Sequence, residues 1–383
     1  MTDQEFVEAF ETCRLPNDQF HHRDHLRLAW IYLGRYGAST AAVRIAESIR
    51  RYASHHGASA KYHETVTIAW LHFVAESARR CPGSSFDQLL QASPELVDKN
   101  TLHQYYSPEL LASETARIHF VPPDRKALPE KKIPDSLRVL LTHLIDYAGL
   151  FPPAALSWPE VAQNYTRYLA SPEGWMLNRL VLPARLVDAQ LPSAWRVTLL
   201  VEDEPGPLPP RIETLETKAA RRLSLPTYCE APLAEINGAF AKIRTGGLTP
   251  HAIPPSEEIA DFLHSAAARS IPFKATAGLH HPIRSFRPLT YSPDSPHAVM
   301  HGFINVFVAA AFAWLGAEQR ILVDILNESD ASAFQFLDGE MLCRGMGLGT
   351  AQIAEARRDF AHSFGSCSFE EPIADLKELG WLP

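Results

Sequence analysis

The chain contains 383 residues, of which 46% are hydrophobic and 21% are charged. This length exceeds one ordinary hydrophobic core and predicts two or three domains. A formal net charge of -8 without any basic run argues against nucleic acid as a partner.

The cysteines and the apolar stretches indicate a soluble protein of a reducing compartment. The five cysteines are scattered and form no CxxC pair, so we expect no disulfide framework. The longest apolar stretch, residues 303–315, is too short to cross a bilayer, so we expect no membrane partner. The acidic N-terminus is unlike a signal peptide, and we therefore predict a cytoplasmic location.

The first 125 residues show helical periodicity. Apolar residues recur at helical spacing in residues 2–11, 23–36, 40–52 and 62–80. Gly37 and Gly57 stand where helices are expected to end. We predict a small helical bundle for residues 1–125, followed by a proline-rich, charged linker at residues 126–135.

Residues 136–383 alternate short apolar runs with helical segments. This alternation predicts a mostly parallel sheet that closes as a (β/α)8 TIM-like barrel. The predicted strands cover residues 179–183, 196–201, 211–217, 227–230, 239–244, 272–277 and 321–325. The predicted helices cover residues 136–147, 158–170, 256–269, 302–315 and 351–363.

Histidines open two helices of the first module. His22 and His63 each lie on the apolar face of a predicted helix, and His25 follows His22 by about one turn. Imidazoles and carboxylates that meet between facing helices can hold Zn²⁺ or iron. His22, His25, His63 and Glu64 are therefore a candidate metal site. The alternative is that these are hydrogen-bonded structural histidines near helix N-termini.

This module resembles a family of small uncharacterised bacterial proteins. The shared elements are FHHRDHLRLAW, KYHETVT, YYSPELLAS and FVPPDR, which all lie within residues 1–125. The resemblance implies that the module can stand alone, and it brings no known activity.

Two predicted strands of the second module each contain a lysine near the carboxyl end, with a glycine four residues after it. Lys242 precedes Gly246 and Gly247, and Lys274 precedes Gly278. Residues near the carboxyl ends of barrel strands face the active site, where burial and a second cation lower the pKa of an amine and make it nucleophilic. The glycines would let backbone N–H groups approach an anion. The alternative is that both lysines form ion pairs inside the barrel mouth with Glu213, Glu216 or Glu230.

These lysine segments resemble the class I aldolase barrels of the deoxyribose-phosphate aldolase type. That family carries K-x-x-T-G, then K-A-S-G-G, then a G-T/S-S phosphate turn. Here the segments are Lys242-Ile-Arg-Thr-Gly246, Lys274-Ala-Thr-Ala-Gly278 and Phe364-Gly-Ser-Cys-Ser368. The last lies about 55 residues further on than the family pattern places it. The resemblance implies that Lys242 forms a Schiff base, that Lys274 lowers its pKa, and that an anion binds at Gly365 and Ser366.

Several other polar residues are expected near the same rim. Glu230, at the end of the preceding strand, is the candidate proton-transferring acid. Arg244, His280 and His281 are not part of the family's pattern. We expect Arg244 among the substrate-binding groups and the two histidines among the acid–base groups, with His301 nearby.

Two helical positions carry simpler interpretations. Asn305 is either a buried, hydrogen-bonded polar group or part of the site. Arg357 and Arg358 are expected on the solvated face of a helix.

Three functions stay open, in this order. The first is an aldolase-like lyase that uses Lys242 and Lys274 on a small carbonyl compound. The second is a metal-dependent enzyme or metal-binding protein centred on the histidine cluster, with zinc or iron as its cofactor. The third is a non-catalytic protein in which a helical interaction module accompanies a metabolite-binding barrel. A homo-oligomer is compatible with each.

Overall fold

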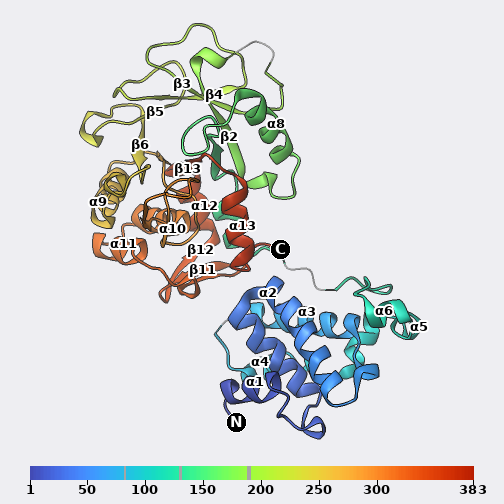
Figure 1. The fold of residues 1–383 in the computed structure, drawn as a ribbon. Coiled ribbons are helices and arrows are strands. Elements are labelled where there is room, and N and C mark those ends of the chain that lie inside the picture. The colour runs from blue at the N-terminus through green and yellow to red at the C-terminus, as the bar shows by residue number, and fades with distance from the viewer. Residues whose placement is uncertain (82, 129–131, 188–190) are drawn as a thin grey trace. The chain divides into compact units, whose positions relative to one another are not determined.

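The computed structural model describes residues 1–81, 83–128, 132–187 and 191–383 and contains two compact units. The first unit comprises Met1–Lys132 together with Lys377–Pro383, and the second comprises Ile133–Leu376 (Figure 1). Each unit is described separately below. None of the described helices is long and apolar enough to cross a membrane.

The described elements of the first unit are helices. The α-helices are α1 (Asp3–Glu11), α2 (His22–His55), α3 (Glu64–Arg80), α4 (Phe86–Ala92), α5 (Pro108–Leu111) and α6 (Glu114–Ile118). Their inward faces form one hydrophobic core that includes Phe6, Phe10, Tyr32 and Phe73. The expected break at Gly37 is present, because this residue leaves helical geometry at φ 70° and interrupts α2.

Eight parallel strands of the second unit close into a barrel. The strands are β1 (Ile145–Tyr147), β2 (Leu177–Pro183), β3 (Val197–Leu200), β4 (Ile212–Thr217), β5 (Thr227–Cys229), β6 (Phe240–Arg244), β7 (Phe273–Thr276) and β13 (Ala361–Ser366). Their order around the barrel is β1-β13-β7-β6-β5-β4-β3-β2. The predicted α/β barrel is therefore confirmed.

Helices accompany only part of this barrel. They are α7 (Asp135–Leu141), α8 (Trp158–Leu169), α9 (Ser256–Ala268), α10 (Phe303–Trp314), α11 (Gln319–Leu326), α12 (Thr350–Asp359) and α13 (Glu370–Glu378). In the described residues, the four connections from β2 to β6 contain no α-helix. Two small antiparallel sheets lie in the long connection between β7 and β13. They are formed by β8 (Ser285–Pro288) with β9 (His297–Met300), and by β10 (Phe334–Phe336), β11 (Glu340–Cys343) and β12 (Met346–Gly349).

Three barrel strands each contain one extra residue near the amino end. Ile145 pairs with Leu177 and Tyr147 with Leu180, so β2 advances three residues where β1 advances two. The same comparison places one extra residue in β4, at Glu213, and one in β13, at His362. Such bulges turn an additional side chain toward a chosen face and are common at barrel rims.

Three of the predicted segments were wrong, for local reasons. Residues 136–147 and 351–363 were each predicted as one helix, yet each contains the end of a helix followed by a barrel strand, β1 and β13 respectively. Residues 321–325 were predicted as a strand and lie in α11. A short apolar run has no periodicity that separates a buried strand from a buried helix.

Candidate functional site

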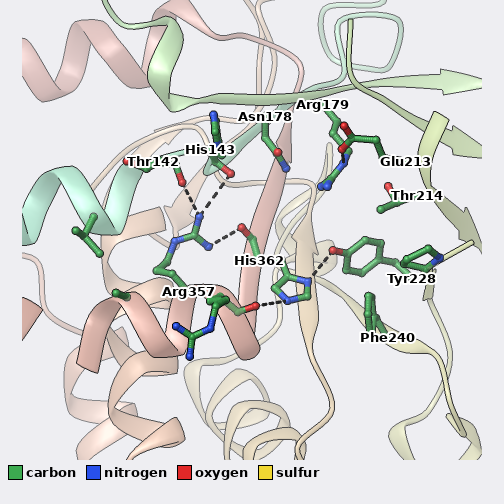
Figure 2. A pocket seen from close by; sticks show the side chains of 14 residues that line it. Thr142, His143, Asn178, Arg179, Glu213, Thr214, Tyr228, Phe240, Arg357 and His362 are labelled. Carbon is green, nitrogen blue, oxygen red and sulfur yellow. Dashed lines mark hydrogen bonds and ion pairs between the residues drawn. The ribbon is translucent and has the colours of Figure 1, made fainter. Parts of the chain in front are cut away.

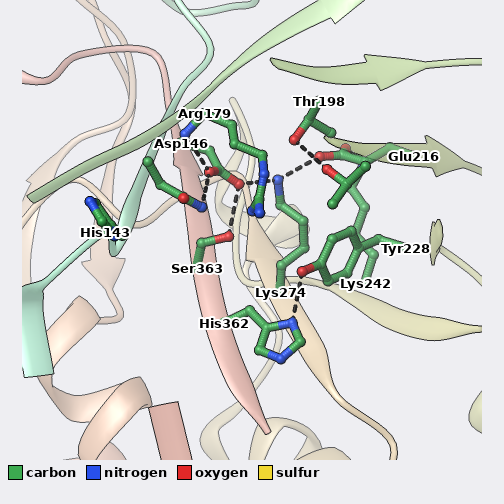
Figure 3. A network of polar contacts seen from close by, with 12 residues as sticks. His143, Asp146, Arg179, Thr198, Glu216, Tyr228, Lys242, Lys274, His362 and Ser363 are labelled. Carbon is green, nitrogen blue, oxygen red and sulfur yellow. Dashed lines mark hydrogen bonds and ion pairs between the residues drawn. The ribbon is translucent and has the colours of Figure 1, made fainter. Parts of the chain in front are cut away.

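A buried cation lies at the centre of the barrel. The Lys274 Nζ atom is 2.5 Å from Asp146 Oδ2 and 2.5 Å from Glu216 Oε1, and all three side chains are at most 3% exposed (Figure 3). Burial by itself would lower the pKa of Lys274, but the two carboxylates outweigh it and raise that pKa. Lys274 is therefore a fixed ammonium ion at neutral pH.

The second predicted lysine lies beside the first. Lys242 and Lys274 are paired across β6 and β7. Lys242 Nζ is 2.8 Å from Glu216 Oε2 and 3.3 Å from Glu230 Oε2. Burial would raise the pKa of Glu216, yet the ammonium groups of Lys274 and Lys242 lower it to about 2. One carboxylate thus joins the two amines.

The polar network becomes more exposed beyond Lys242. The Lys242 side chain is 10% exposed, Glu230 is 25% exposed, and Arg244, which donates to Glu230 Oε1 over 2.8 Å, is 57% exposed. Lys242 and Arg244 are separated by one residue along β6, and Glu230 directly follows β5. The network therefore runs from the barrel centre toward the carboxyl ends of the strands.

Neutral donors complete the environment of Asp146. Its Oδ1 atom accepts hydrogen bonds from Asn178 Nδ2 and from the backbone N–H of Arg179, and its Oδ2 atom accepts one from Ser363 Oγ. Strands β1, β2, β7 and β13 thereby converge on one carboxylate.

We compared the chain with models of known protein families, with curated proteins and with solved structures, and none of the three comparisons finds a match. The site is therefore interpreted from its geometry.

The ion pairs agree with the alternative in which the lysines pair with glutamates. Glu216 and Glu230 are the partners, whereas Glu213 pairs with Arg179 and Arg196 over 2.8 and 3.0 Å. Asp146 was absent from the predicted site, because its strand was taken for the end of a helix.

A cavity of about 600 Å³ opens at the opposite, amino ends of the strands. Its wall includes Arg179 and Glu213 on the early parts of β2 and β4, and Tyr228, Phe240 and His362 on β5, β6 and β13 (Figure 2). Within the barrel, candidate ligand-binding residues were predicted only at the carboxyl ends of the strands, so this cavity was not anticipated.

Tyr228 and His362 are hydrogen-bonded in this cavity. The Tyr228 hydroxyl is 2.7 Å from His362 Nδ1, and His362 Nε2 is 3.2 Å from the carbonyl oxygen of Arg358. Because a carbonyl only accepts, Nε2 carries the proton and Nδ1 accepts from the tyrosine. Burial lowers the pKa of His362 to about 4, so its ring is neutral at pH 7.

The predicted glycines pack against one another. A Cβ atom built on Gly246 would lie 2.8 Å from the Gly278 Cα, and Gly278 has a φ of 81°. A Cβ on Gly247 would lie 2.6 Å from the Ala252 Cβ. Contact between the loops that follow β6 and β7 explains Gly246 and Gly278, and a close approach within the loop after β6 explains Gly247.

Gly365 and Ser366 lie at the carboxyl end of the eighth barrel strand. Gly365 pairs with Thr276 of β7 and with Asp146 of β1. Ser366 Oγ accepts from the backbone N–H of Ser368, just before α13. The extra sequence separation relative to the aldolase pattern lies in the long connection between β7 and β13. The segment with Gly365 and Ser366 nevertheless lies on the strand next to that of Lys274.

The rim histidines pair with carboxylates of α13. His280 Nδ1 is 2.9 Å from Glu371 Oε2, and His281 Nδ1 is 2.6 Å from Asp375 Oδ2. Tyr291 donates to the same Glu371 oxygen over 3.2 Å. His301 Nε2 instead donates to the Pro254 carbonyl oxygen. Asn305 is fully buried and bonds backbone groups, so its structural interpretation holds.

The predicted metal cluster of the first unit does not form. His22 Nε2 contacts the Leu96 carbonyl oxygen, and His63 Nε2 contacts that of Leu111. Glu64 pairs with Arg50, and the His25 ring stacks on Phe20. Throughout the described ranges, no group of three or more histidine, cysteine, aspartate or glutamate side chains could hold a metal ion. Backbone carbonyls satisfy the imidazoles, as in the structural alternative.

The helix carrying Arg357 also differs from expectation. Arg358 is exposed and pairs with Asp359, but Arg357 points inward and donates to the carbonyl oxygens of Leu140, Thr142, His143, Ala361 and His362. Arg357 therefore joins α12 to the chain around β1 and β13 and is not a solvated residue.

Proposed function

We propose that the second unit is a lyase that acts on a small carbonyl compound through a Schiff base on Lys242. The observation that carries this proposal is the placement of the Lys242 amine between the buried Glu216 and the more exposed Glu230. An amine in this position has a fixed anion on its inner side and a proton acceptor on its outer side.

The first chemical step would use both carboxylates. Glu230 takes a proton from the Lys242 ammonium, and the free amine attacks the carbonyl carbon. The carbonyl oxygen then leaves as water, with one proton returned by Glu230 and one transferred from the amine nitrogen. The product is an iminium ion that carries the same positive charge as the original ammonium. Glu216 therefore stabilises the intermediate as it stabilised the lysine, without rearrangement of the network.

The second step would break a carbon–carbon bond. A base removes the proton of a hydroxyl group β to the iminium carbon, and the electrons of the broken bond pass into the iminium to form an enamine. Protonation and attack by water then release the second product and restore the Lys242 amine. Lys274, held by Asp146 and Glu216, acts as a positioning residue that fixes Glu216.

The resemblance to class I aldolases supports this assignment. The lysines occupy adjacent strands in the order that the family pattern has, and the segment containing Gly365 and Ser366 follows on the next strand of the barrel. These three agreements concern the same barrel end as Glu230.

Borohydride trapping tests the proposal. The full chain is incubated with acetaldehyde, glyceraldehyde, pyruvate and glyoxylate, reduced, digested and analysed by mass spectrometry. We expect an adduct on Lys242 that is lost in Lys242→Arg and retained in Lys218→Arg, a change of an exposed lysine in the same unit. Absence of an adduct with every compound, or an undiminished adduct in folded Lys242→Arg, overturns the proposal.

A further inference from the structure

The amino-terminal cavity is built by the irregularities of the barrel strands. The extra residue of β4 is Glu213, that of β13 is His362, and that of β2 lies at Asn178 or Arg179. All four of these residues line the cavity of about 600 Å³. Three separate bulges that add side chains to one cavity indicate a shaped site, because bulges commonly re-aim side chains near functional positions.

The charges along the cavity are unequal. Among the described residues, its lining contains the three arginines Arg179, Arg357 and Arg358, the last paired with Asp359 outside the lining, but only one carboxylate, Glu213. That carboxylate already pairs with Arg179 and also with Arg196. The unequal charges make the cavity attractive to an anion.

Arg357 contributes a half-buried charge. In the part of the chain that the structure describes, its hydrogen bonds go to backbone carbonyl oxygens and none of its contacts is an ion pair. Burial lowers the pKa of Arg357 to about 10, which leaves it charged at pH 7. Carbonyl dipoles solvate this guanidinium without neutralising it. An anion in the cavity would provide the negative charge that balances Arg357.

The remaining wall is apolar and aromatic. Val139, Pro226, Phe240 and Ala354 line it together with the ring of Tyr228 (Figure 2). The volume lies within the range of ordinary small-molecule sites, which combine an apolar wall with a few placed polar groups.

We infer that this amino-terminal cavity binds a small organic anion whose carboxylate or phosphate group faces the arginines and whose apolar part lies against Phe240 and Tyr228. The site is distinct from the carboxyl-end site of Lys242. The Tyr228 ring separates the two, since its hydroxyl contacts His362 in the cavity while the Lys274 ammonium lies 5.6 Å from its ring centre. The inference does not depend on Schiff-base chemistry.

Ligand-detected NMR on the full chain tests the inference with benzoate and phenyl phosphate as anionic probes and benzamide as the neutral match of benzoate. We expect saturable binding of at least one anion and at least tenfold weaker binding of benzamide. The tighter of the two anions identifies the preferred headgroup. Equal binding of benzoate and benzamide, or no saturable binding of either anion, overturns the inference.

Two variants locate the binding. Ala354→Phe fills the cavity from α12 and should abolish anion binding, whereas Ala351→Phe, at an exposed position of the same helix, should not. Arg358→Ala should weaken binding several-fold, and Arg320→Ala, an exposed arginine outside the cavity lining, should leave it unchanged. Retained affinity in both folded cavity variants places the anion elsewhere and refutes the assignment.

Discussion

The ammonium group of Lys274 lies 2.5 Å from the Asp146 carboxylate, with both side chains 1% exposed inside the barrel. This pair joins β7 to β1, on the two sides of the last strand β13. The closed barrel thus contains, at its centre, charges that are stable only while each has its partner.

The Lys274–Asp146 pair predicts a large effect of removing one charge. Lys274→Met should destabilise the second unit by about 3–5 kcal/mol, because it leaves buried carboxylates short of a cation. Urea unfolding of the full chain measures this change. In the double variant Lys274→Met/Asp146→Asn the loss should be smaller than the sum of the two single losses, with a coupling of about 1–3 kcal/mol. Strict additivity would show that the contact has no energetic role.

The contact between two loop glycines predicts a matched pair of alanine effects. Gly278 and Gly316 have nearly the same φ, 81° and 82°, but a Cβ atom would lie 2.7 Å from the Gly246 Cα in the first case and meet nothing within 4 Å in the second. Gly316→Ala should cost about 1 kcal/mol from backbone strain, and Gly278→Ala about 3 kcal/mol. Equal losses in thermal or urea unfolding would contradict the close approach.

The neutral imidazole of His362 predicts a loss of stability in mild acid. Its pKa of about 4 in the folded chain lies below the value of about 6.5 expected after unfolding. The unfolded chain therefore binds more protons between these values, and stability falls as the pH falls from about 6.5 toward 4. The stability that depends on a neutral His362 ring is fully present above about pH 6.5 and is lost as the pH falls to about 4.

The variant His362→Asn should flatten part of this pH dependence. Its amide oxygen can still accept the hydrogen bond from Tyr228, but the side chain no longer titrates. The measurement is the difference in unfolding free energy of the full chain between pH 7.5 and pH 5. His301, whose pKa is also lowered by burial, keeps some dependence in the variant. An unchanged difference would show that His362 is not buried as a neutral ring.

The buried amide of Asn305 predicts a cost that its size alone does not explain. Its oxygen accepts from the backbone N–H of Arg284, and its nitrogen donates to the carbonyl oxygens of Ile325 and Glu328. Asn305→Leu, of similar volume, should destabilise the unit by about 2–4 kcal/mol, because it leaves buried backbone groups unpaired. Gln319→Leu, at an exposed position of α11, serves as the control and should change stability by less than about 1 kcal/mol.

The sequence predicted those strands that turns and loops isolate. Strands β2 to β7 are short apolar runs between proline-rich or polar segments. Strands β3 to β7 each lie within a predicted range, and β2 begins two residues before its predicted range of 179–183. Strand β1 follows α7 after the three residues 142–144, and only Phe360 separates α12 from β13. Neither connection contains a glycine or a proline, so the periodicity of the helix hid both strands.

The same difficulty limited the prediction of the site. Lys242 and Lys274 stood out because a lysine inside an apolar strand is unusual, and the structure places them side by side. Asp146 and His362 lay in the two hidden strands. A bulge depends on the register between strands far apart in the sequence, so no local pattern could have indicated that His362 faces inward.

The bulge in β13 has a consequence for how this barrel can vary. Ala361 pairs with Phe273 and Ser363 with Lys274, so the strand would keep its regular alternation if the intervening His362 were deleted. Such a deletion would leave Ser363 beside Asp146 while it removes the imidazole from the opposite mouth. The side chains at the two ends of the barrel can therefore change independently. Insertion or loss of a single residue alters the amino-terminal end, and substitution alters the carboxyl-terminal end.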